Sequence, residues 1–99
     1  MIKRFVKLTF HPQLVPEFLA LFEETKGRIR HFPGCRHLEL LQEAGRSEVF
    51  FTFSIWQDEA ALNAYRDSDL FQDTWARTKA LFRDKPEAWS LNIVSEAAD

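Results

Sequence analysis

The chain has 99 residues, of which 45% are hydrophobic and 28% charged, and its net charge is -2. This length supports one core, and the composition excludes a disordered or fibrous chain. The charge balance excludes a strongly basic nucleic-acid binder, because such a protein needs surplus Lys and Arg to displace phosphate counterions. We therefore expect one domain, over residues 1–99, with no nucleic-acid partner.

The first part of the chain predicts a strand followed by a helix. Residues 2–10 alternate between two faces with a period of two, which indicates a half-buried strand; Arg4 is the one charge on its apolar side. Apolar side chains then recur at helical spacing, with charged residues opposite them. This helix is expected to have Pro16 in its first turn and to end at Pro33 and Gly34.

The middle of the chain predicts a hairpin. Residues 35–42 alternate loosely, and residues 43–46 contain Gly45, which can adopt a positive φ and so make a turn. Residues 48–56 form the strand with the clearest pattern. This strand is apolar on one face and partly apolar on the other, which is typical of a central or doubly covered strand.

The remaining elements are a divided helical region and a last strand. Asp58 is a candidate helix cap, residues 66–69 are expected to interrupt the helix, and a second segment follows up to Pro86. Residues 88–94 alternate again. The predicted order is βαββαβ, an α+β ferredoxin-like fold: a four-stranded antiparallel sheet with both helical segments on one face.

Such a fold leaves one face of the sheet uncovered. Aromatic residues of the first strand (Phe5) and of residues 48–56 would then lie in water, which is unfavourable for a monomer. A second copy stacked on that face would cover them. We therefore expect a homodimer.

The sequence also bears on location. No apolar run reaches the roughly 20 residues that a membrane helix requires, and the first residues lead into a strand pattern rather than a signal sequence. The single cysteine, Cys35, excludes an internal disulfide and is typical of a reducing compartment. We expect a cytoplasmic protein with no membrane partner.

Three short segments in this order resemble the antibiotic biosynthesis monooxygenase family. They are residues 33–35 (PGC), 55–62 (IWQDEAAL) and 65–71 (YRDSDLF). The resemblance implies a dimeric α/β barrel of ferredoxin-like subunits. It also implies a monooxygenase that oxidises a small aromatic substrate, quinol or anthrone-like, with molecular oxygen and no cofactor.

Departures from the family pattern keep two alternatives open. Tyr65 and Leu70 stand where family members often carry His, which favours a non-catalytic dimer that binds a small ligand or is associated with stress. Haem degradation is the third hypothesis for the function. Trp75 occupies the position of the iron-binding His of the haem degraders, and residues 2–10 lack their Asn.

Five residues are the candidates for the site. Trp56 matches the Trp that lines the pocket in this family, although a plain core aromatic is an equal alternative. His37 is the candidate base because imidazole titrates near neutral pH; a surface position beside Glu39 is the alternative. Asn63 and Trp75 are expected to contact the substrate from the helices. Tyr65 is expected to be catalytic through its hydroxyl group.

Two of these candidates exclude each other, and no metal site is expected. Asn63 and Tyr65 are two apart on one helix, so they cannot both point into a cavity; Tyr65 is in phase with the apolar side. The three histidines and Cys35 show no metal-ligand spacing. The glycines are too scattered for a phosphate-binding loop.

Overall fold

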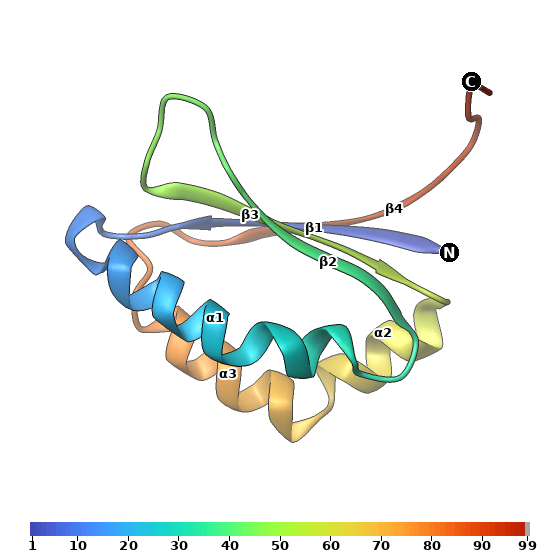
Figure 1. Ribbon diagram of the computed structural model, residues 1–99, viewed down its shortest axis with the longest axis horizontal. Helices are drawn as coiled ribbons and strands as arrows, with labels where there is room; N and C mark the ends of the chain where they lie inside the picture. The colour runs from blue at the N-terminus through green and yellow to red at the C-terminus, as the bar shows by residue number, and fades with distance from the viewer. Residues whose placement is uncertain (99) are drawn as a thin grey trace.

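The computed structural model describes residues 1–98, and it has the predicted ferredoxin-like architecture: an antiparallel sheet with the helices packed on one face (Figure 1). In chain order the elements are β1 (Ile2–Thr9), η1 (Pro12–Leu14), α1 (Val15–Arg30), β2 (Cys35–Gln42), β3 (Val49–Trp56), α2 (Glu59–Arg66), α3 (Asp69–Lys79) and β4 (Glu87–Asn92). None of the described helices is long and apolar enough to cross a membrane.

The sheet has the strand order β2-β3-β1-β4. β3 therefore lies between β2 and β1, which confirms the central position predicted from its apolar faces. All three pairings are antiparallel, and Phe5 of β1 lies opposite Phe53 on one side and Trp89 of β4 on the other. The interruption predicted around residues 66–69 separates α2 from α3.

Caps and one glycine fix the junction between β3 and α2. The Asp58 carboxylate accepts the Ala61 N–H at 2.8 Å, so α2 begins directly after the strand. Gly34, at φ 89°, ends the turn after α1, and its carbonyl accepts the Gln57 N–H at 2.8 Å. A Cβ at Gly34 would overlap the Cβ of Ala61, so only glycine allows this close approach.

The core has two clusters at opposite ends of the sheet. At one end Phe10 is fully buried and stacks on Phe18 with ring centroids 4.1 Å apart; Leu8, Phe50 and Leu81 complete the cluster. At the other end Trp56 packs with Cys35 and Leu62. Burial of a large apolar side chain stabilises the fold by roughly 1.5–3 kcal/mol, so each cluster anchors its own end of the sheet to the helices.

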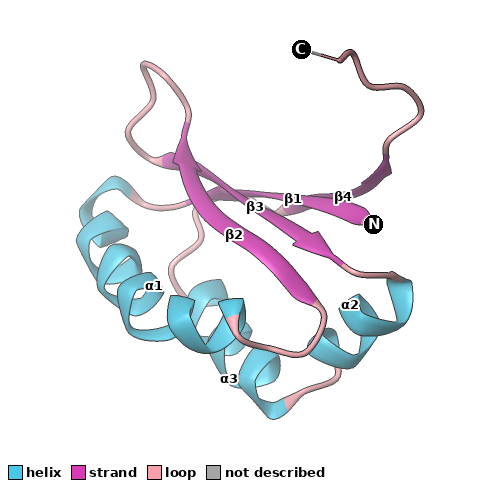
Figure 2. Cartoon of the chain, turned by 45° about the vertical axis from the view of Figure 1, so that its right-hand side comes forward, coloured by secondary structure: helices cyan, strands magenta, loops and turns pink. Residues whose placement is uncertain are grey.

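The helices leave one face of the sheet uncovered, which we call the outer face (Figure 2). A second set of aromatic residues lies on it. Phe5 and Phe53 stack there with centroids 4.7 Å apart and planes inclined by 12°. Trp89 is 42% exposed, and Leu41 and Leu91 are also exposed. In residues 1–98 no helix covers this face. A second copy of the chain would cover it, and the homodimer stays a prediction.

Candidate functional site

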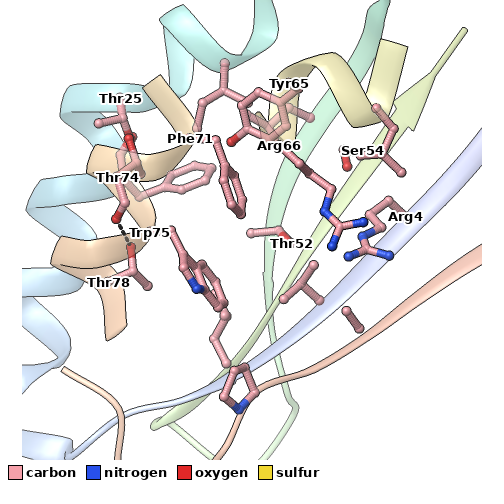
Figure 3. Close-up of a pocket in the computed structure, with 18 of the residues that line it drawn as sticks. Arg4, Thr25, Thr52, Ser54, Tyr65, Arg66, Phe71, Thr74, Trp75 and Thr78 are labelled. Carbon is pink, nitrogen blue, oxygen red and sulfur yellow. Dashed lines mark hydrogen bonds between the residues drawn. The ribbon is translucent and has the colours of Figure 1, made fainter. Parts of the chain in front are cut away.

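A cavity of about 380 Å³ lies between the inner face of the sheet and the helices (Figure 3). This volume is within the range of small-molecule sites, roughly 300–1,000 Å³. The apolar lining comes from β1, β2, β3 and all of α1, α2 and α3, with the principal side chains Val6, Leu21, Leu38, Trp56, Leu62, Tyr65, Phe71 and Trp75.

Four of these side chains form a continuous aromatic wall. Trp56 stacks on Tyr65 with centroids 4.8 Å apart, and Tyr65 meets the edge of Phe71 at 5.2 Å. Phe71 in turn stacks on Trp75 at 5.8 Å. The wall joins β3, α2 and α3, and it offers an aromatic, apolar surface to an aromatic ligand.

Trp56 contributes its ring, and not its N–H group, to this wall. It is the last residue of β3 and is only 1% exposed. Its Nε1–H donates to Ser54 Oγ at 3.0 Å, so the donor is already satisfied within the protein. A ligand beside Trp56 therefore meets an aromatic surface.

Tyr65 brings a neutral hydroxyl to the cavity. Burial, and secondly the charge of a Cys35 thiolate, raise the pKa of Tyr65 well above its ordinary value of 10.0. The phenol therefore stays protonated at neutral pH and acts as a hydrogen-bond donor. A second polar atom, Thr74 Oγ1, is buried in the lining without a partner in the part of the chain that the structure describes.

The structure brings together three of the five predicted residues. Trp56, Tyr65 and Trp75 line the cavity. His37 lies on the outer face, where its ring is 5.4 Å from Phe53 and its Nε2 is 3.6 Å from Glu39 Oε2. Asn63 is exposed and belongs to a shallow depression on the surface with Arg66, Asp67, Phe71 and Gln72.

Two arginines of the lining were absent from the predicted set. Arg4 reaches the cavity from β1, and its Nη1 donates to Ser90 Oγ of β4 at 2.8 Å. Its signal was visible in the sequence as the single charge on the apolar side of the first strand. Arg66 had no such signal, because it stands in the segment expected to interrupt a helix.

Comparisons with known proteins bear on the family and the fold. The family model described as antibiotic biosynthesis monooxygenase matches residues 1–77. A crystal structure of an antibiotic biosynthesis monooxygenase has a TM-score of 0.90 at 21% identity, covering 96% of this chain and 100% of its own. The cofactor-independent oxygenase SnoaB from Streptomyces nogalater has a TM-score of 0.85 at 19% identity, covering 99% and 97%. A comparison with curated proteins gives no match.

Proposed function

The chain belongs to the antibiotic biosynthesis monooxygenase family, and we propose on that premise that it is a cofactor-independent monooxygenase of a small aromatic substrate. The observation that carries the proposal is the internal cavity with its aromatic wall of Trp56, Tyr65, Phe71 and Trp75. A solved protein of the same fold, SnoaB, is itself described as a cofactor-independent oxygenase.

An anthrone-like substrate suits such a site because the reaction needs no outside reductant. The methylene carbon of the substrate and one O₂ become a carbonyl and one water, so the substrate supplies all four electrons. Loss of a proton gives an electron-rich anion that passes one electron to O₂. The two radicals then combine into a C–O bond, which gives a hydroperoxide after protonation. Loss of the second proton of the methylene carbon and cleavage of the O–O bond leave the carbonyl and release water.

The residues of the cavity support this chemistry by position and polarity. The aromatic wall holds the ring and excludes water from the anion. The Tyr65 hydroxyl donates a hydrogen bond to the substrate oxygen on which negative charge develops. The described lining residues include no histidine, so the acidity of the substrate, increased by that hydrogen bond, controls formation of the anion.

Oxygen uptake with dithranol, a hydroxylated anthrone, tests the proposal. We expect uptake above the rate of autoxidation, unchanged after dialysis against a chelator. Trp75→Ala removes part of the wall and should lower turnover about tenfold or more, whereas Trp75→Phe keeps a ring there and should retain most of it. Uptake at the autoxidation rate, tested over several anthrones and quinols, would reject the enzyme.

The second candidate function is a ligand-binding protein without turnover. It is favoured by the absence of an imidazole base from the cavity lining in residues 1–98. This protein would bind the same aromatic compounds, and Trp75→Ala would weaken binding while oxygen uptake stayed at the background rate for every variant.

We propose further that the protein is a homodimer through its outer face. The Phe5–Phe53 stack forms the centre of an apolar patch with Trp89 and Leu91, and ion pairs such as Lys7–Glu87, at 4.0 Å, lie at its border. A stable interface of this kind buries roughly 800 Å² per partner. Light scattering should give twice the 11.6 kDa mass of one chain.

A further inference from the structure

Two guanidinium groups converge at one edge of the cavity. Arg4 projects from the inner face of β1 and is half-buried, while Arg66 is the last residue of α2. Figure 3 shows both groups directed to the same side, beside Ser54 and Thr52. Partial burial, and secondly the charge of Arg66, lower the pKa of Arg4 below its ordinary value.

No carboxylate of residues 1–98 neutralises these two groups, because neither forms an ion pair there. Other arginines do find partners: Arg77 pairs with Glu24 at 3.0 Å. Glu87 is the one acidic residue of the described lining, and its Oε2 lies 4.0 Å from Lys7 Nζ. Two like charges beside an apolar cavity repel each other, and a bound anion would remove that repulsion.

We propose that Arg4 and Arg66 bind the carboxylate of an aromatic substrate whose ring lies against the aromatic wall. The planar fork of a guanidinium matches the two oxygens of a carboxylate, and two such forks can hold one oxygen each. The inference rests on the proposed function, from which it takes the aromatic ring of the substrate. It adds that this substrate carries a carboxylate. The substrate class is therefore an aryl carboxylic acid.

A neutral hydroxyl in the lining supports a defined orientation for such a ligand. Tyr65 directly precedes Arg66 in α2 and also lines the cavity. Its hydroxyl is a neutral group suited to a phenolic oxygen. A hydroxyaryl carboxylate would place its acid at the arginines and its hydroxyl at Tyr65.

Calorimetry with two isosteric probes tests the charge preference apart from any turnover. We expect naphthalene-2-carboxylate to bind at least tenfold more tightly than naphthalene-2-carboxamide, because only the former carries charge. The difference should shrink as salt is added, since ions screen a site at the mouth of a cavity. Equal affinities at low salt would overturn the proposal.

Variants locate the effect at the arginines. Arg66→Gln replaces an exposed side chain, so the fold should persist, and it should weaken carboxylate binding roughly tenfold with carboxamide binding unchanged. Arg4→Lys keeps the charge but loses the fork, and a smaller, severalfold loss is expected. Arg28→Gln is the matched control, because Arg28 is exposed on α1 outside the cavity. An equal loss for both probes in Arg66→Gln would contradict a carboxylate site.

The outcomes separate this inference from the proposed function. Preference for the carboxylate without oxygen uptake would support the arginine site and reject the monooxygenase. Uptake at equal kcat/KM for an anthrone and its carboxylated analogue would support the monooxygenase and reject the arginine site.

Discussion

The two faces of the sheet are both rich in aromatic residues, yet they have different environments. On the inner face Trp56 is 1% exposed and forms part of a cavity; on the outer face Trp89 is 42% exposed. The helices of one chain cover only the inner face (Figure 2). The inner aromatics therefore line a cavity of small-molecule size, whereas the outer ones lie on a face that no described helix covers.

The central strand explains why only the inner face is hollow. Along the outer side of β3 the residues are large: Phe51, Phe53 and Ile55. Along its inner side the two middle residues, Thr52 and Ser54, are small, and both line the cavity. Space between the sheet and the helices therefore remains unfilled, while the outer side is continuous and apolar.

The same substitution on the two faces gives the largest expected difference. Trp56→Ala should lower the free energy of unfolding by about 3–5 kcal/mol, because it removes a large side chain that is almost fully buried. Trp89→Ala, measured by urea denaturation at a concentration where the protein is monomeric, should cost less than about 1 kcal/mol. Equal losses would show that the outer face is as well packed as the inner one within a single chain.

A charge at the centre of the outer face should next disrupt the dimer. Phe53→Asp places a carboxylate in the stack with Phe5, and we expect it to weaken association by roughly 2–4 kcal/mol. Light scattering at micromolar concentration should then give a monomer with the fold retained. Leu19→Asp is the matched control, because Leu19 is also exposed but lies on α1, and it should remain a dimer. A dimeric Phe53→Asp would place the interface elsewhere.

Alkaline pH should reveal the burial of Tyr65, the single tyrosine of the chain. Because its folded pKa lies above the unfolded value of 10.0, the stability that burial of the neutral phenol contributes is present below pH 10 and lost as pH rises toward the folded pKa. The loss is at most about 1.4 kcal/mol per pH unit. The absorbance of the phenolate reports the pKa of Tyr65 in the folded protein, and urea denaturation at a series of pH values measures the loss of stability. Tyr65→Phe should lack this part of the pH dependence. If the free energy of unfolding of this variant fell with pH as steeply as that of the wild type, the prediction would be wrong.

His37 should give the smallest effect. It is half-exposed beside Glu39 on the outer face, so His37→Ala should change the free energy of unfolding by about 0.5 kcal/mol or less. Because His37 lies on the outer face and does not line the cavity, the pH profile of oxygen uptake should also be unchanged. A rate that falls selectively below neutral pH in this variant would restore His37 as the base.

Much of the fold was predictable because its signals are local. The Asp58 cap, the interruption between α2 and α3 and the alternation of β3 all depend on neighbours within a few residues, and each is confirmed. The inward position of Tyr65 was expected for the same reason, from its phase with the apolar side of its helix. His37 shows the limit: its strand alternates loosely, and a period of two does not say which side faces the helices.

The elements, their two faces and the surplus of aromatic residues on both sides of β3 are readable from the amino-acid sequence. Periodicity and helix caps act between residues that are close in the chain, so these features need no knowledge of packing. The side of the sheet that encloses the cavity, and the position of Arg4 and Arg66 at one edge of it, depend on contacts between distant parts of the chain. The two arginines lie on β1 and α2, and their approach depends on how the helices pack across the sheet, which no local pattern encodes.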